Sequence, residues 1–179
     1  MIKINMGCGW RDFGRDWVHI DGGDYPHLDS CDITELPYDN ETVDLIYASC
    51  VIEYFDREEA IDVLKEWVRV LKSGGQLRLS VPDFEVMADL YVKNKYPLDS
   101  FLGPLYGKMP MRKETIYHKT VYDYQSIKEM LVSLGIRDVR RYDWRNTDHA
   151  QFDDHSQAYL PHMDKENGTL IQLNIEGKK

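Results

Sequence analysis

The stretch IKINMGCGWRDFGRDWVHIDG, residues 2–22, contains two short apolar runs, each followed directly by glycine or by an acidic residue. The runs Ile2 to Met6 and Trp17 to Ile20 have the length and apolar content of strands covered on both faces. Gly7 and Gly9 follow the first run, and Asp21 follows the second. This pattern predicts two neighbouring parallel strands whose carboxyl ends carry a glycine turn and a carboxylate.

Further strands and a helix follow along the chain. Val43 to Ala48 and Gln76 to Val81 are apolar runs of strand length. Between them, Asp56 followed by Glu59 predicts a capping box that begins a helix, and Gly74 and Gly75 predict its end. The apolar residues at helical spacing, which we expect to face the sheet, are Ile61, Leu64, Trp67, Val68 and Leu71.

The second half continues the alternation of helices and strands. Helices are predicted over Asp83 to Lys95 and Asp123 to Leu134, and strands over Val139 to Trp144 and Leu170 to Ile175. Residues 97–121 combine four glycine or proline breakers after Pro97 with many apolar side chains, which indicates an irregular cap or lid. The prediction is an α/β fold with a single doubly wound, mostly parallel sheet, in one domain over residues 1–179.

Composition excludes several classes of protein. The net charge is −9, with 31 acidic and 22 basic residues, so the chain would repel a nucleic-acid backbone and bulk nucleic acid is not an expected partner. The three cysteines form no CxxC pair, which favours a reducing, cytoplasmic setting. The first residues do not resemble a signal peptide, and no apolar run approaches the ~20 residues of a membrane span.

The residues after the predicted strands describe a pocket for an adenosine-like ligand. The turn Gly7-Cys8-Gly9 lets a ligand approach the backbone, and Asp21 can accept hydrogen bonds from both hydroxyls of a ribose. Asp32, at the end of a third strand, could accept from the adenine amine while Ile33 packs on the ring.

A dinucleotide is the rival ligand in such a fold. Its fingerprint requires a third glycine three residues beyond Gly9 and a helix N-terminus for the pyrophosphate. Asp12 occupies that position and would repel a diphosphate. S-adenosylmethionine has no phosphate and carries a sulfonium cation, so it suits an acidic pocket better than NAD does.

The ordered motifs NMGCG, DWVHIDG, DITELPYDNETVDLIYAS, VIEYF and EWVRVLKSGGQLRLSVPDF resemble those of class I S-adenosylmethionine-dependent methyltransferases, in particular the small type-11-like group. The resemblance covers residues 3 to 84 and implies a Rossmann-like sheet of seven strands with the last one antiparallel. It implies that Gly7 and Gly9 approach the methionine part of the cofactor, that Asp21 binds its ribose, and that Asp32 and Ile33 hold the adenine. The residues expected to contact S-adenosylmethionine are Gly7, Cys8, Gly9, Asp21, Gly22, Asp32, Ile33, Ala48, Ser49 and Cys50.

The sequence departs from the family pattern in two respects. Only seven residues, Trp10 to Asp16, separate the first two strands, so either the usual first helix is reduced to a turn or the strand limits differ by a few residues. The family often has histidine where Cys50 and Tyr54 stand, which affects the acceptor side of the site.

Methyl transfer needs a base only if the acceptor must lose a proton. His118, just after the cap, is the candidate catalytic residue; the alternative is a cap histidine that hydrogen-bonds to the backbone. Tyrosines in and around the cap and the strands could stack on an acceptor or simply pack. The tail contains three histidines and two adjacent aspartates, namely His149, Asp153, Asp154, His155 and His162. These residues could form a polar loop, an oligomer contact or a site for a divalent cation, and we assign no metal.

The leading hypothesis is a methyltransferase that acts on an oxygen or nitrogen atom of a small molecule. A sugar or sugar nucleotide as acceptor is implied by the resemblance alone. The other hypotheses are a catalytically inactive cofactor-binding or scaffold protein and an NAD-dependent oxidoreductase, and a homo-oligomer is left open.

Overall fold

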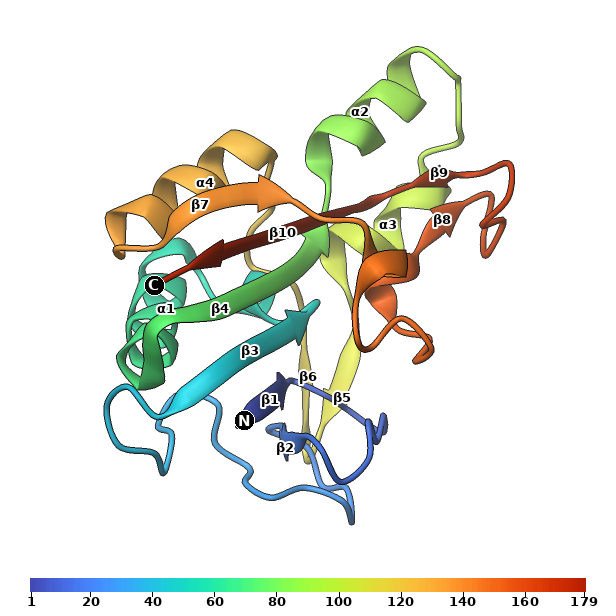
Figure 1. The fold of residues 1–179 in the computed structure, drawn as a ribbon. Helices are drawn as coiled ribbons and strands as arrows, with labels where there is room; N and C mark the ends of the chain where they lie inside the picture. Colours follow the sequence, from blue (N-terminus) through green and yellow to red (C-terminus); the bar gives the residue numbers. More distant parts are fainter.

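The computed structural model describes residues 1–179 and is built around a six-stranded mixed sheet (Figure 1). β1 pairs in parallel with β2 and β3, β3 pairs in parallel with β4, and β10 runs antiparallel to both of its neighbours, β4 and β7. The predicted antiparallel last strand is therefore present, inserted between β4 and β7. In the order in which they lie side by side, the strands are β2 (Val18–Ile20), β1 (Lys3–Met6), β3 (Val43–Ser49), β4 (Leu71–Pro82), β10 (Gln172–Lys178) and β7 (Arg137–Arg141).

The predicted seventh strand is missing because the segment before Asp32 forms no ladder. Its only sheet pairing is one parallel bridge between Ile20 and Ser30. The residues that lead to this bridge, GGDYPHLDS, contain no apolar run, and Pro26 cannot donate a backbone hydrogen bond. The sheet therefore ends at β2, and Asp32 follows a bridge instead of a strand.

Of the two faces of the sheet, α-helices cover only one, so the prediction of a doubly wound fold is wrong for the other face. α1 (Arg57–Val70) and α4 (Tyr124–Ser133) both pack into the main hydrophobic core on the first face. No helix connects β1 to β2, which confirms that the usual first helix is reduced to turns. In place of that helix, Phe13 and Trp17 pack against Tyr47 on the second face.

The C-terminal segment completes the cover of the second face with loops and two short 3-10 helices, η2 (Trp144–Asn146) and η3 (His155–Gln157). The Tyr47 hydroxyl donates to Asp154 Oδ2 at 2.5 Å, and Asn174 Nδ2 donates to the Ser156 carbonyl at 2.9 Å. The strands present polar side chains on this face because the loops above them offer polar backbone groups as partners.

Helix α1 begins as predicted. Asp56 accepts from the amides of Glu58 and Glu59, and the Glu59 side chain accepts from the Asp56 amide, which completes the capping box. The helix ends at Val70, earlier than Gly74, because Leu71 already has extended backbone and β4 begins there. Leu64 and Trp67 are buried as predicted, whereas Ile61 and Val68 are half-buried; the other buried positions of α1 are Ala60, Val63 and Val70.

The cap segment has more regular structure than predicted. After α2 (Phe84–Val92), it forms helix α3 (Asp99–Tyr106) and a hairpin of β5 (Met109–Met111) and β6 (Glu114–Ile116). A second small hairpin joins β8 (Tyr159–Leu160) to β9 (Thr169–Leu170). Met109 and Met111 lie on either side of Pro110, and such alternation is typical of a strand. The glycines and prolines of the segment pointed instead to irregular structure. None of the helices combines the length and the apolar character that crossing a bilayer would require.

Candidate functional site

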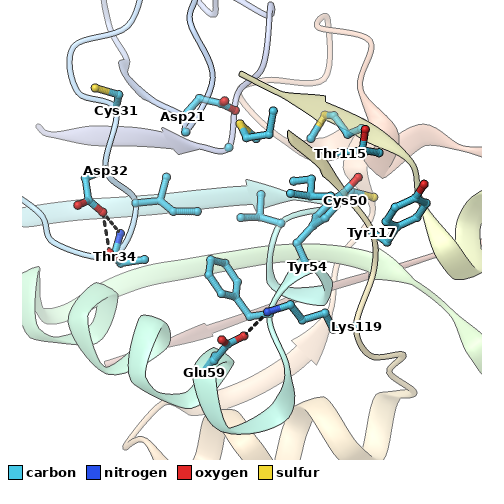
Figure 2. A pocket seen from close by; sticks show the side chains of 18 residues that line it. Asp21, Cys31, Asp32, Thr34, Cys50, Tyr54, Glu59, Thr115, Tyr117 and Lys119 are labelled. Atoms are coloured by element: carbon cyan, nitrogen blue, oxygen red, sulfur yellow. Dashed lines mark hydrogen bonds and ion pairs between the residues drawn. The ribbon is translucent and has the colours of Figure 1, made fainter. Parts of the chain in front are cut away.

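A cavity of about 740 Å³ lies where β1, β2 and β3 end (Figure 2). This volume is within the range of small-molecule and cofactor sites, about 300–1,000 Å³. Six of the predicted cofactor residues line it, namely Gly7, Asp21, Gly22, Asp32, Ile33 and Cys50. The other lining residues are Cys31, Thr34, Val51, Tyr54, Phe55, Glu59, Met109, Met111, Thr115, Ile116, Tyr117 and Lys119.

The turn after β1 requires glycine at position 7. Gly7 has φ +65°, a conformation that side chains disfavour, and a Cβ atom there would overlap Cγ2 of Val51. Gly9 also has positive φ, but it lies off the cavity wall, and its amide donates to Asp21 Oδ2 at 2.8 Å. The backbone of this turn therefore fixes the carboxylate that ends the next strand.

Asp21 is held in place and keeps acceptor capacity. Its Oδ2 accepts from the Gly9 amide and its Oδ1 accepts from the Gly23 amide at 2.6 Å. A carboxylate oxygen can accept two hydrogen bonds, so each oxygen has one free position. Because Asp21 borders the cavity, these positions can meet two neighbouring hydroxyl groups of a ribose.

Asp32 forms a local turn at the rim of the cavity. Its Oδ1 accepts from the Thr34 amide at 2.8 Å and the Thr34 hydroxyl at 2.6 Å, and these hydrogen bonds lower the pKa of Asp32. No hydrogen bond engages Oδ2, which is available to an amine donor. The neighbouring Ile33 is fixed through its carbonyl, which accepts from Trp67 Nε1 at 2.7 Å.

Four predicted residues do not line the cavity. Ala48 and Cys8 are buried, and Ser49 lies beside them at the end of β3. Burial and the nearby Asp21 raise the pKa of Cys8 to about 12, so its thiol is protonated at neutral pH and packs beneath the glycine turn. Together with Gly9, these residues support the wall of the cavity; direct contact with a cofactor stays a prediction for all four.

Cys50 lies on the wall in an unusual backbone conformation. Its φ is +55°, and its amide donates to the Ser80 carbonyl, so β4 holds it there. Burial and the nearby Glu53 raise the pKa of the Cys50 thiol well above its ordinary value. The thiol lies 3.7 Å from Gln172 Oε1, where it acts as a weak donor.

The sequence analysis missed Glu53, in the 3-10 helix η1 (Ile52–Tyr54) directly behind the cavity wall. Its side chain is fully buried and neither carboxylate oxygen has a hydrogen-bond partner. Burial raises the pKa of Glu53 to about 7. Nothing in the run VIEYF distinguishes this acid from an exposed one, because its burial follows from the way the cap packs over η1.

His118, the predicted base, lies behind the wall and not on it. Its Nδ1 is 2.9 Å from the Pro104 carbonyl, to which it donates, and its ring packs edge-on against Tyr54. The other nitrogen, Nε2, lies 3.9 Å from Glu53 Oε1. Burial lowers the pKa of His118, so the imidazole is neutral at neutral pH. The hydrogen bond to the Pro104 carbonyl matches the alternative of a cap histidine bonded to the backbone, and a role as base stays a prediction.

The cap supplies part of the cavity wall. Met109, Met111 and Ile116 from the hairpin line the cavity, together with Tyr117. Below them, Lys119 forms an ion pair of 2.7 Å with Glu59 of α1. The cap residues that line the cavity are mostly apolar, and Tyr54 of η1 lines it as well.

The remaining candidates lie away from the cavity. His149 is buried beside Tyr47, and Asp154 caps η3. No group of three or more histidine, cysteine or acidic side chains is arranged to hold a metal ion. The dinucleotide alternative also lacks its helix N-terminus, because Asp12 lies in the turns that replace the first helix and accepts from the Gly14 amide.

Comparison with known proteins finds a family match in the first half of the chain. Residues 14–79 match the model of a methyltransferase domain family, Methyltransf_11. A comparison with curated proteins finds no match.

Solved structures share the fold along nearly the whole chain. A methyltransferase from Archaeoglobus fulgidus described as SAM-dependent has a TM-score of 0.60 at 15% identity, covering 99% of this chain and 86% of that one. A putative methyltransferase of Haloferax volcanii, solved in complex with the activator Trm112, has a TM-score of 0.55 at 15% identity, covering 99% and 81%. The 1,6-didemethyltoxoflavin-N1-methyltransferase of Burkholderia thailandensis, solved with its substrate and S-adenosylhomocysteine, has a TM-score of 0.56 at 12% identity, covering 99% and 70%. At sequence identities of 12–15%, these similarities show a shared fold and nothing more specific.

Proposed function

We propose that the chain is a class I S-adenosylmethionine-dependent methyltransferase that transfers the methyl group to an oxygen or nitrogen atom of a small molecule. The observation that carries the proposal is the cavity of about 740 Å³ bordered by Gly7, Asp21 and Asp32. Gly7, Asp21 and Asp32 lie at neighbouring positions along one edge of the sheet. The free acceptor positions of the two carboxylates match the hydroxyl and amine donors of an adenosine.

The residues of the cavity fit the cofactor. Asp21 would hold the ribose, Asp32 Oδ2 would accept from the adenine amine, and Ile33 would pack on the ring. The bound S-adenosylmethionine supplies a methyl group already activated by positive sulfur, so the protein must mainly align the acceptor and exclude water.

The cap, residues 97–121, is proposed to cover the acceptor. Its apolar residues Met109, Met111 and Ile116 line the same cavity as Cys50 and Tyr54. Tyr54 and Tyr117 offer aromatic surface for a ring-shaped acceptor. A sugar or sugar nucleotide, the acceptor that the sequence resemblance implies, has such a ring, and so does the heterocycle methylated by the Burkholderia enzyme.

A screen of sugar nucleotides and small metabolites for release of S-adenosylhomocysteine tests the proposal. We expect turnover with at least one acceptor and none with Asp21→Ala, which should bind the cofactor poorly. Asp24→Ala is the matched control, because Asp24 is an exposed carboxylate three residues further on that does not line the cavity. Turnover only with a protein or nucleic-acid acceptor would contradict the small-molecule assignment.

A further inference from the structure

Two segments that contribute to the cavity differ in the charge of their residues. Residues 21–35, on the side of the glycine turn, contain no lysine or arginine and five acidic residues: Asp21, Asp24, Asp29, Asp32 and Glu35. Residues 108–119, which form the hairpin and the segment after it, contain four basic residues and one acidic residue. Figure 2 shows Asp21 and Asp32 on one side of the cavity and Tyr117 and Lys119 on the other.

Three of the basic residues on the hairpin have no acidic partner. Lys108, Arg112 and Lys113 are exposed and take part in none of the ion pairs of the structure. Arg112 and Lys113 form the turn between β5 and β6, and we call these two the basic tip; Lys108 precedes β5 at the other end of the hairpin. In a chain with 31 acidic and 22 basic residues, acidic partners are in excess. Lys119, at the end of the same segment, is paired with Glu59. The charge of the basic tip is therefore available for a ligand.

The hairpin places the basic tip next to the site. Met109 and Met111 line the cavity, and Met111 lies close to Gly22, where its sulfur would be 3.4 Å from an added Cβ. Arg112 follows directly, with φ +55°, a value unusual for a residue other than glycine. Arg112 also borders a second hollow of about 590 Å³, which shares Cys31 with the main cavity.

From this arrangement we propose that the methyl acceptor carries a phosphate or carboxylate group that binds the basic tip. This inference rests on the proposed function, because it concerns the second substrate of the same cavity. The acidic segment suits a cofactor that carries a positive charge, and the basic tip suits an acceptor of opposite charge. Arginine and lysine side chains bind both anionic groups, arginine through two parallel hydrogen bonds.

The test uses the intact protein loaded with S-adenosylhomocysteine and titrated by calorimetry at low ionic strength. The probes are inorganic pyrophosphate, malonate and, as a neutral probe, glucose. We expect pyrophosphate or malonate to bind, to shift the methyl NMR signals of Met109 and Met111, and to bind about tenfold more weakly to the double variant Arg112→Gln, Lys113→Gln. Stronger binding of pyrophosphate indicates a phosphate acceptor, and stronger binding of malonate a carboxylate acceptor.

The control variant is Arg137→Gln. Arg137 is exposed and unpaired on β7, at the opposite edge of the sheet, so its loss should leave the probe affinity unchanged. Equal affinity of the double variant and the wild type for the anionic probes would overturn the inference. The basic tip would then serve only to balance the charge of Asp24 and Asp29, which border the second hollow. Binding to anionic phospholipid vesicles but to neither soluble anion would overturn it in favour of membrane docking.

The cofactor titration separates this inference from the proposed function. If S-adenosylhomocysteine does not bind the wild-type protein, the function fails, whereas binding of pyrophosphate to the unloaded protein still reports on the basic tip. If S-adenosylhomocysteine binds equally to the wild type and the double variant while neither anion binds, only the inference fails.

Discussion

The substitution Glu53→Gln should make the protein more stable at alkaline pH. Glu53 is fully buried, and its carboxylate has no hydrogen-bond partner. The nearest basic group is the His118 imidazole at 3.9 Å, and burial lowers the pKa of that imidazole. The charged form of Glu53 is therefore poorly compensated, which is why burial raises its pKa from 4.5 to about 7.

The size of the effect follows from this pKa. Between pH 4.5 and pH 7 the folded protein retains a proton at Glu53 that the unfolded chain releases, so this group makes the folded state less stable as pH rises. Each pH unit between the two pKa values corresponds to about 1.4 kcal/mol, so the penalty reaches about 3 kcal/mol above pH 7. Glutamine has nearly the same shape and no charge, so Glu53→Gln lacks this penalty.

Urea unfolding followed by tryptophan fluorescence from pH 4.5 to 8.5 measures the effect. The free energy of unfolding of Glu53→Gln minus that of the wild type should lie near zero at pH 4.5 and rise to about +3 kcal/mol at pH 8. Buried histidines with lowered pKa, such as His149, titrate in both proteins and cancel in this difference. The exposed Glu166→Gln serves as control and should give a flat difference. A flat difference for Glu53→Gln would refute the reasoning.

Three further substitutions test the walls of the site. Gly7→Ala should destabilise the protein by about 1–3 kcal/mol in urea unfolding, since its Cβ would overlap Val51 at a positive φ, and an unchanged midpoint would show that the turn adapts. Trp67→Phe removes the hydrogen bond to the Ile33 carbonyl and should cost about 1 kcal/mol of stability, with weaker cofactor binding by calorimetry; full affinity would mean that Ile33 does not hold the adenine. His118→Ala should lower turnover while it leaves the affinity for S-adenosylhomocysteine nearly intact, and an unaltered rate would remove His118 from the mechanism.

Much of the fold followed from local patterns in the sequence. The run before Gly7, the capping box of Asp56 and the apolar strand Val43–Ser49 are each specified by neighbouring residues, and the structure has all three. The strand expected before Asp32 is missing for a local reason, since GGDYPHLDS has no apolar run, whereas the missing first helix depends on long-range packing. Phe13 and Trp17 fill the space of a helix only because the C-terminal segment folds over the same face.

The residues of the candidate site also fall into two groups, those that could be placed from the sequence and those that could not. Residues that directly follow strands, such as Asp21 and Cys50, could be placed from sequence because the ends of parallel strands meet at one edge. The cap wall could not, since only tertiary packing brings Met109 and Tyr117 to the cavity. The position of His118 behind Tyr54 likewise depends on how helix α3 packs, which supplies the Pro104 carbonyl.

Calorimetric titration of the wild type and Asp21→Ala with S-adenosylhomocysteine tests the central claim, that the cavity at the ends of β1, β2 and β3 holds the cofactor by its ribose. We predict binding to the wild type, a loss of about 2 kcal/mol in Asp21→Ala from two lost hydrogen bonds to a charged acceptor, and unchanged affinity in Asp24→Ala. Equal affinity of the wild type and Asp21→Ala, with both proteins folded, would contradict the account.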